Sequence, residues 1–307
     1  KAPNSQTPHG EIEGALIKMN NGYACIQPWK TLGDNDLEYH LESISVNKPT
    51  DIARAAIKCC MIDGEARSNK VDLFKSLETP RYHLTLNSDD FSKIDRSTIN
   101  GFTHLKIKSN KNFGNTLELI NKFSQFKIRV DFNESITPDQ LIDFNESLSS
   151  HTRDKIDFIE DPFPYDPDLW CQYQKETGLN FALDRGPYNA NKGFKVRVWK
   201  PVILPFVETI QPICITHNMD HEFGRRYAAY CASISNYSIN VHGIGNFNHV
   251  NNGYGLGMDD YLESGKKYIK EVSSKSDMVV LLVNADRSTQ SKLVDAFPKV
   301  DFIITSG

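Results

Sequence analysis

The sequence predicts an α/β fold, a (β/α) barrel of modified TIM type that follows a smaller α+β segment. From about Gly101, short apolar strands alternate with amphipathic helices, which is the pattern of a parallel sheet. About seven such units are too many for a small domain, and they suit a barrel whose functional site lies at the carboxyl ends of its strands. Before Gly101, a hairpin signal and two helix signals indicate a separate arrangement.

The amino-terminal segment contains a turn at Asn20–Gly22 that is typical of a β-hairpin. Its strands and helices are expected at Glu11–Met19, Gly22–Gln27, Asp34–Val46 and Thr50–Arg67. The Pro/Gly-containing loop 27–34 carries a Trp that looks exposed, Trp29. Such a loop either packs structurally or forms a lid over a site, and the residues leave both interpretations open.

The barrel elements follow in order along the chain. Strands are expected at His104–Lys108, Lys127–Asn133, Asp157–Glu160, Phe181–Asp184, Lys195–Lys200, Pro212–Thr216 and Asn240–Ile244. Helices are expected at Gly114–Phe126, Pro138–Ser149, Asp166–Thr177 and Glu222–Ile234. The interval between Lys200 and Ile213 is too short for a full crossover helix, so we expect an irregular connection there.

One strand, Ile128–Asn133, carries a row of polar side chains on a single face. Because side chains alternate along a strand, Arg129, Asp131 and Asn133 point the same way. Polar groups inside a barrel are costly to bury unless they bind a partner or a ligand. This strand is therefore the centre of the candidate site.

Carboxylates end three successive predicted strands, at Asp131, Glu160 and Asp184. One acidic strand end alone is more often a loop residue or a helix cap. Three that converge at one barrel mouth repel one another unless a cation lies among them. Carboxylate oxygens from only three side chains, with positions left for water and substrate, suit Mg²⁺ or Mn²⁺.

Lysines lie on the strands before and after the acids. Lys106 and Lys108 share one face of the strand that precedes them, and Lys200 ends the strand that follows. A Lys-x-Lys motif alone is weak evidence, since solvated edge strands also contain it. Burial, a divalent cation and a second ammonium each lower the pKa of a lysine, which then acts as a base. The pattern favours proton abstraction next to a carboxylate.

Composition excludes several other classes. The chain has 307 residues, 39% of them hydrophobic and 24% charged, with a net charge of −4, so nothing points to nucleic acid or an anionic membrane as a partner. Its six cysteines lack metal-site or disulfide spacing and fit a reduced, cytoplasmic protein. No apolar run is long enough for a membrane span. The oligomeric state cannot be inferred from the sequence.

These segments together resemble the enolase superfamily, in particular its muconate-lactonising subgroup and the o-succinylbenzoate synthase family. The resemblance covers roughly residues 11–258, and the amino-terminal segment is similar to that superfamily's capping domain. It rests on His104–Lys108, Arg129–Asn133, Phe158–Pro162, Ala182–Asp184, Lys200-Pro201 and His242–Gly245. It implies a capping domain at 1–97 with a lid near 27–34, and a catalytic barrel at 98–258.

The resemblance also implies roles. Asp131, Glu160 and Asp184 would hold Mg²⁺, or Mn²⁺ in its place, while Lys108 removes the proton α to a carboxylate. Lys200 would stabilise charge from the opposite side. The reaction would be a syn dehydration that yields o-succinylbenzoate in menaquinone biosynthesis. Supporting residues would be Lys106, Arg129 and Asn133, and substrate contacts Trp29, Thr216, His217 and Asn218.

Three features depart from the superfamily's pattern. Arg185 follows Asp184 where Glu is usual, Ser109-Asn110 replaces a Gly-containing turn, and His217 lies where a serine-rich loop is common. These departures leave open an N-acylamino acid racemase or dipeptide epimerase, which uses the same two lysines. They also leave open a metal-binding pseudo-enzyme whose site Arg185 alters.

Residues 259–307 lie beyond the last barrel strand. Their helix–strand–helix–strand pattern, at Tyr261–Val272, Met278–Val283, Ser288–Phe297 and Val300–Thr305, resembles a fragment of a 5′-nucleotidase-type metallophosphatase. Asn284 stands where that family has a metal-binding His, so we expect an extension without chemistry of its own.

Overall fold

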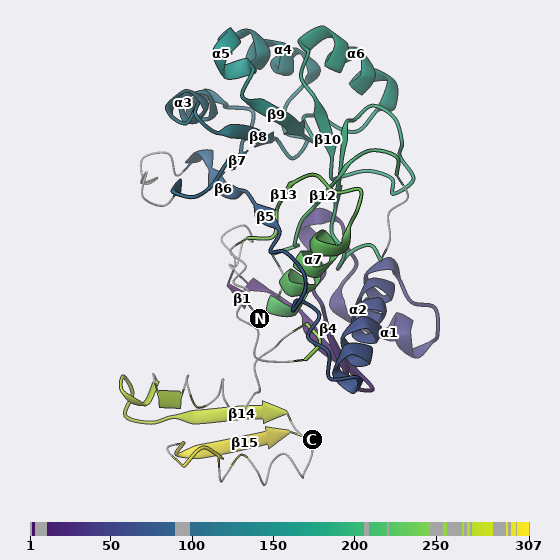
Figure 1. The fold of residues 1–307 in the computed structure, drawn as a ribbon, viewed down its shortest axis with the longest axis vertical. Coiled ribbons are helices and arrows are strands. Elements are labelled where there is room, and N and C mark those ends of the chain that lie inside the picture. The colour runs from purple at the N-terminus through teal and green to yellow at the C-terminus, as the bar shows by residue number, and fades with distance from the viewer. Residues whose placement is uncertain are drawn as a thin grey trace.

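The fold has a barrel, a cap and a small carboxyl-terminal unit (Figure 1). A computed structural model of the chain describes residues 2–3, 11–89, 99–205, 209–219, 221–245, 254–256, 266, 269–270, 272–284, 293, 296–298 and 300–306. Its helices are η1 (Lys30–Leu32), α1 (Leu37–Ser45), α2 (Asp51–Ser68), α3 (Gly114–Lys122), α4 (Pro138–Glu146), α5 (Ser150–Arg153), α6 (Pro167–Thr177) and α7 (Glu222–Ile234).

Seven parallel strands form the main sheet, and strands consecutive in sequence are neighbours in space. They are β6 (Leu84–Asn87), β7 (His104–Lys108), β8 (Lys127–Asp131), β9 (Ile156–Glu160), β10 (Phe181–Leu183), β11 (Val196–Trp199) and β12 (Ile213–Ile215). The connecting helices α3 to α6 lie along the outer side of these strands in Figure 1. Parallel strands with outer helices are the arrangement of a (β/α) barrel.

An eighth strand closes the barrel. β13 (Val241–His242) pairs in parallel with β5 (Arg81–Tyr82), which directly precedes β6, and Gly243 bridges to Thr216 beside β12. The backbone N–H of His83 donates to the carbonyl of His242 at 2.9 Å. The predicted fold class is thus confirmed. Since β5 and β6 lie before residue 97, the capping domain predicted at 1–97 includes the first barrel strand.

The cap consists of a hairpin and two helices. β3 (Ala15–Met19) pairs antiparallel with β4 (Gly22–Ile26), and α2 packs on β4. A Cβ built on Gly22 would lie 1.8 Å from the carbonyl oxygen of Cys60, so only glycine permits this approach. Apolar side chains of β4 and α2 share one buried cluster with β12 and α7, which joins the cap to the barrel.

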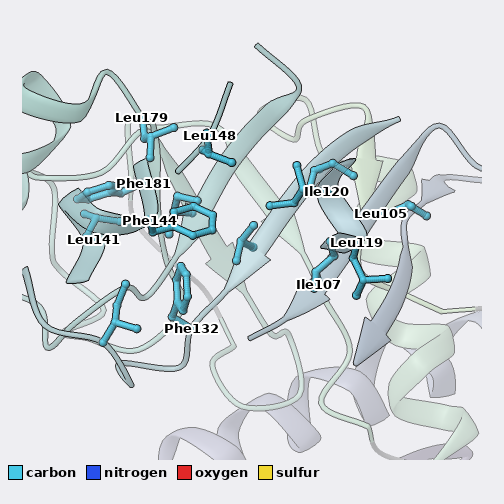
Figure 2. Close-up of a cluster of buried hydrophobic side chains, with 14 of the residues drawn as sticks. Leu105, Ile107, Leu119, Ile120, Phe132, Leu141, Phe144, Leu148, Leu179 and Phe181 are labelled. Carbon is cyan, nitrogen blue, oxygen red and sulfur yellow. The ribbon is translucent and has the colours of Figure 1, made fainter. Parts of the chain in front are cut away.

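A second buried cluster fills the space between the strands and their outer helices. Figure 2 shows Leu105 and Ile107 of β7 near Leu119 and Ile120 of α3. Phe132, just after β8, packs edge to face on Phe144 of α4. Because strand residues alternate in direction, these apolar side chains face the helices, while the polar side chains between them face the barrel interior.

The carboxyl-terminal unit contains two parallel strands, β14 (Val280–Asn284) and β15 (Phe302–Ser306), which lie away from the barrel in Figure 1. Both predicted strands of this extension are confirmed. Its predicted helices, at 261–272 and 288–297, lie largely outside the described residues. At the other end, β1 (Ala2–Pro3) pairs antiparallel with β2 (Glu11–Ile12).

Candidate active site

A cavity of about 540 Å³ lies at the carboxyl ends of the barrel strands. It brings together eleven of the residues predicted for the site: Trp29, Lys106, Lys108, Asp131, Asn133, Glu160, Asp184, Lys200, Thr216, His217 and Asn218. They come from the loop 27–34 and from strands β7 to β12 or the segments that follow them. Parallel register places these strand ends at one mouth, as the strand pattern predicted.

Lys106 lies between two of the predicted metal ligands. Its Nζ is 2.9 Å from Oδ2 of Asp131 and 2.7 Å from Oε1 of Glu160. All three side chains are at least nine-tenths buried. Burial lowers the pKa of Lys106, but the attraction of Asp131 and Glu160 is stronger and raises it above the ordinary lysine value. The group is therefore a fixed cation at the working pH of most enzymes.

The surroundings of Glu160 disfavour its charged form. Burial raises its pKa above the ordinary value, and repulsion from Asp131 and Asp184 adds to this, although Lys106 opposes it. A buried carboxylate near two others gains most from an additional positive charge.

The third carboxylate, Asp184, forms an ion pair with Lys200. Burial raises the pKa of Asp184, but Lys200 and Lys106 outweigh burial and lower the pKa below its ordinary value. Asp161 fixes the backbone at Asp184 and Arg185. Its Oδ1 accepts from the backbone N–H of Asp184 at 3.0 Å, and its Oδ2 accepts from the backbone N–H of Arg185 at 2.9 Å. Asp161 is therefore a positioning residue for this strand end.

Lys108 is level with Asp131 in the pairing of β7 and β8, two residues beyond Lys106 on the same face. Burial lowers its pKa below the ordinary lysine value, and the nearby ammonium groups of Lys106 and Lys200 lower it further, against the attraction of Asp131 and Glu160. The direction is the one that the sequence pattern predicted for a lysine that acts as a base.

The donor set at this mouth fits a divalent cation in its chemistry. The carboxylates of Asp131 and Glu160, which are buried, and of Asp184, which is partly buried, line one cavity, and the repulsion among them would be relieved by a hard cation such as Mg²⁺. In the part of the chain that the structure describes, no three His, Cys, Asp or Glu side chains are already spaced to hold a metal ion. The ammonium groups of Lys106 and Lys200 contact these carboxylates and already compensate part of their charge.

Arg129 is the predicted supporting residue that does not line the cavity. It is 2% exposed and lies deeper in the barrel, where its Nε donates to Oδ2 of Asp157 at 2.8 Å. Its Nη1 also donates to the carbonyl of Val241 at 3.0 Å, and its guanidinium stacks on Phe158. The alternation along β8 correctly predicted that Arg129 points into the barrel. In the structure it lies one layer below the mouth and does not line the cavity.

Asn133 and Arg185 form a polar contact at the rim. Nη2 of Arg185 donates to Oδ1 of Asn133 at 3.0 Å, and the backbone N–H of Asn133 donates to Oδ1 of Asp131 at 3.1 Å. Arg185 also lines the cavity. The positive charge that departs from the superfamily's pattern therefore lies at the mouth.

The loop 27–34 lies against the segment after β12. Trp29 is 4% exposed and donates from Nε1 to the carbonyl of Asn218 at 3.0 Å, so the prediction that it is exposed was wrong. Gln27 donates from Nε2 to the carbonyl of Met219 and accepts from the backbone N–H of His221, each at 3.1 Å. These contacts pack the loop on the segment after β12, and they fit both the structural and the lid interpretation.

Three polar residues of the cavity, His83, Thr85 and Asn87, were not predicted from the sequence. They alternate with apolar Leu84 and Leu86, and this period of two was the signal that could have identified them. The strand was overlooked because it is only four residues long.

Known proteins match the chain in both sequence and fold. Residues 1–66 match the family model described as O-succinylbenzoate synthase, N-terminal domain. The o-succinylbenzoate synthase of Bdellovibrio bacteriovorus is 25% identical over 242 residues, which cover 72% of this chain and 73% of that protein.

Solved structures extend the likeness to the fold. A dipeptide epimerase from Methylococcus capsulatus, complexed with Mg ion, has a TM-score of 0.59 at 14% identity and covers 80% of this chain and 92% of its own. An enolase superfamily member from Listeria innocua has a TM-score of 0.61 at 14% identity, with 80% and 85% covered. A mandelate racemase/muconate lactonizing enzyme from Roseiflexus sp. has a TM-score of 0.57 at 11% identity, with 76% and 87% covered.

The chain therefore has the fold of the enolase superfamily, a (β/α) barrel with an amino-terminal cap, and the resemblance predicted from its strand ends is confirmed. Its sequence is similar to o-succinylbenzoate synthases, in residues 1–66 by the family model and over 242 aligned residues by the relative from Bdellovibrio bacteriovorus. Over the described residues, no helix is long and apolar enough to cross a membrane.

Proposed function

We propose that this protein is an o-succinylbenzoate synthase. It would dehydrate 2-succinyl-6-hydroxy-2,4-cyclohexadiene-1-carboxylate to o-succinylbenzoate, in menaquinone biosynthesis. The observation that carries the proposal is the set of two lysines, Lys108 and Lys200, that line one cavity with the three carboxylates of Asp131, Glu160 and Asp184. Likeness to the Bdellovibrio bacteriovorus synthase supports this choice of reaction.

The substrate would be a small carboxylate. Lys106, Lys108 and Lys200 all line the cavity, and they would draw an anion into it. Asp131, Glu160 and Asp184 would hold Mg²⁺, which when bound supplies positive charge to the substrate carboxylate as its α-carbon loses a proton. The Mg ion in the epimerase from Methylococcus capsulatus supports a divalent cation in this fold.

Lys108 would be the base. Its lowered pKa leaves a larger share of neutral amine at neutral pH, which then accepts the proton from the carbon next to the carboxylate. The same nitrogen, now protonated, would return that proton to the departing hydroxyl on the same face. One C–H bond and one C–O bond break, a C=C bond forms, and the products are the aromatic ring and water.

Lys200 and Lys106 would act as cations. Lys200 lies on the other side of the carboxylates, in its ion pair with Asp184, and would stabilise negative charge that develops on the substrate. Lys106 stays protonated between Asp131 and Glu160 and helps to keep the pKa of Lys108 low.

The same geometry supports a second reaction, epimerisation of N-acylamino acids or dipeptides. It requires one lysine on each side of an α-carbon, and Lys108 and Lys200 line the same cavity from β7 and from the end of β11. The fold likeness to a dipeptide epimerase favours this alternative. A third interpretation is a pseudo-enzyme, which would bind a metal but turn over no substrate. It is based on Arg185, which lines the cavity at its mouth.

A spectroscopic assay tests the proposal. The diene substrate loses its ultraviolet absorbance when it is dehydrated, so purified protein with Mg²⁺ should remove that absorbance rapidly, and EDTA should prevent it. If the wild-type protein leaves the diene unchanged, the synthase proposal is wrong. Exchange of α-protons in deuterated water with N-acyl amino acids or dipeptides would then indicate the epimerase. Mg²⁺ binding without any exchange would indicate the pseudo-enzyme.

A further inference from the structure

One part of the cavity, here called the floor, is lined by His83 and Thr216, whose side chains carry no net charge. They are 5% and 7% exposed. His83 lies between β5 and β6, and Thr216 directly follows β12, so the two residues lie beside β13, where the barrel closes. Gly243 lies between them, because a Cβ there would be 2.6 Å from Cγ2 of Thr216 and 3.1 Å from Cε1 of His83. Glycine at this position therefore lets the two side chains come close together.

The tautomer of His83 is fixed by its neighbour. Nη1 of Arg129 lies 2.9 Å from Nδ1 of His83, and a guanidinium can only donate, so Nδ1 is the acceptor. The proton of the neutral ring then resides on Nε2, which forms no hydrogen bond with a described residue. Burial, together with Arg129 and Lys106, holds the pKa of His83 well below its ordinary value and keeps the ring neutral. Arg129 in turn is oriented by its bond to Asp157.

Thr216 offers a hydroxyl without a partner. Its Oγ1 is buried and has no hydrogen-bond partner among the residues that the structure describes. A buried hydroxyl that stays unbonded costs free energy, so such a group is retained where a ligand bonds to it. The floor thus presents one N–H donor and one hydroxyl, which either donates or accepts.

We propose that His83 Nε2–H and Thr216 Oγ1 form a subsite for an uncharged oxygen of the substrate, a carbonyl or a hydroxyl. This inference rests on the proposed function. The charged groups at the mouth match the carboxylate of the substrate, whereas neutral donors match a neutral oxygen. The ketone of the succinyl chain has such an oxygen, and so does the amide of a dipeptide. Arg129 is then a positioning residue that acts through His83, which gives the buried guanidinium a role in recognition.

Thr216→Val separates a ligand contact from a structural role. The substitution keeps the shape and removes a hydroxyl that has no protein partner, so the thermal midpoint should stay the same or rise. The kcat/KM should nevertheless fall about tenfold, mainly through KM, because one hydrogen bond to the substrate is lost. Unchanged kcat/KM would overturn the subsite.

Thr177→Val is the matched control. Thr177 ends α6, far from the cavity lining, and its Oγ1 donates to the carbonyl of Tyr173 at 2.7 Å. Its replacement should lower the thermal midpoint and leave kcat/KM unchanged, the reverse of the Thr216→Val result. Equal loss of kcat/KM in both variants would mean a general packing effect and would overturn the inference.

His83→Asn tests the second donor. The Asn side-chain oxygen can still accept from Arg129, but nothing then replaces Nε2–H. We expect about a tenfold loss in kcat/KM, again mainly through KM. A loss confined to kcat, or none, would contradict a binding role for His83.

A crystal structure of the ligand-free protein tests the subsite independently of the reaction. An ordered water bonded to both Nε2 of His83 and Oγ1 of Thr216 would support it, even if the wild-type protein does not dehydrate the diene. A floor without such a water would contradict it, even if the protein proves to be a synthase. Failure of the subsite and failure of the proposed function are thereby distinguished.

Discussion

Lys106 sets the balance of charge among the buried side chains of the site. Its ammonium contacts Asp131 and Glu160 at hydrogen-bond distance and compensates part of the negative charge that a divalent cation would also compensate. Sequence alone identified this lysine and both acids, because the acids end two successive strands and Lys106 lies on one face of the strand before them. It could not show that the ammonium lies between the carboxylates, since that depends on side-chain rotamers and burial.

We predict that Lys106→Met lowers the free energy of unfolding by about 3–5 kcal/mol without Mg²⁺, because two buried carboxylates lose their counter-charge. Millimolar Mg²⁺ should stabilise this variant more than the wild type, since the ion then supplies the missing charge. Urea unfolding with Mg²⁺ and with EDTA measures both effects. Equal stabilisation of the two proteins by Mg²⁺ would argue against a metal site on these acids.

The buried side chain of His242 should make the folded protein less stable in acid. Its Nδ1 accepts from the backbone N–H of Ile215 at 3.1 Å, and burial, together with Arg129, lowers its pKa to about 4. The unfolded chain binds the proton near pH 6.5, so stability is complete above that pH and declines toward pH 4. This group alone should cost about 2 kcal/mol at pH 5 relative to pH 8.

The His242→Asn variant checks the sign and the source of that loss. Asn keeps an acceptor for Ile215 but does not titrate, so the variant should lose about 2 kcal/mol less than the wild type between pH 8 and pH 5. Urea unfolding at the two pH values gives the comparison. The same pH dependence in both proteins would assign the acid sensitivity to other groups.

At the scale of elements, alternation and helix periodicity predicted most strands and helices from β7 to α7. Two features were missed for a physical reason. β6 is only four residues long, so its period of two was not distinctive. The burial of Trp29 depends on Asn218, which is 189 residues away in the chain, and local patterns carry no such information.

The contact between the cap helix and its hairpin gives a prediction at this scale. Gly22→Ala should lower the free energy of unfolding by about 3 kcal/mol, because the added Cβ overlaps the carbonyl of Cys60. Gly114→Ala is the control, since at the start of α3 only the side chain of Asn112 lies within 4 Å, at 3.8 Å. It should leave stability unchanged or raise it by up to about 1 kcal/mol. Thermal or urea unfolding would detect the difference, and similar values for both variants would refute the close approach.

At the scale of the whole molecule, the barrel could be predicted but its closure could not. Parallel strands follow from the alternation of strands and helices. The pairing of Arg81–Tyr82 with Val241–His242 joins distant parts of the chain, and this closure is what brings His83 and Thr216 to the cavity floor. Closure of the barrel thus adds two polar side chains, His83 and Thr216, to the predicted acids and lysines of the cavity, and no local motif reveals that these two lie together.

The role of Lys108 is the central claim, and turnover of the diene by lysine variants tests it most directly. With Mg²⁺, the wild-type protein and Lys175→Ala, a control at an exposed lysine of α6, should remove the diene absorbance at the same rate. Lys108→Ala should be slower by about 100-fold or more, because the base is gone while the acids remain. Lys108→Ala that turns over the diene as fast as the wild type would contradict the assignment of Lys108 as the base.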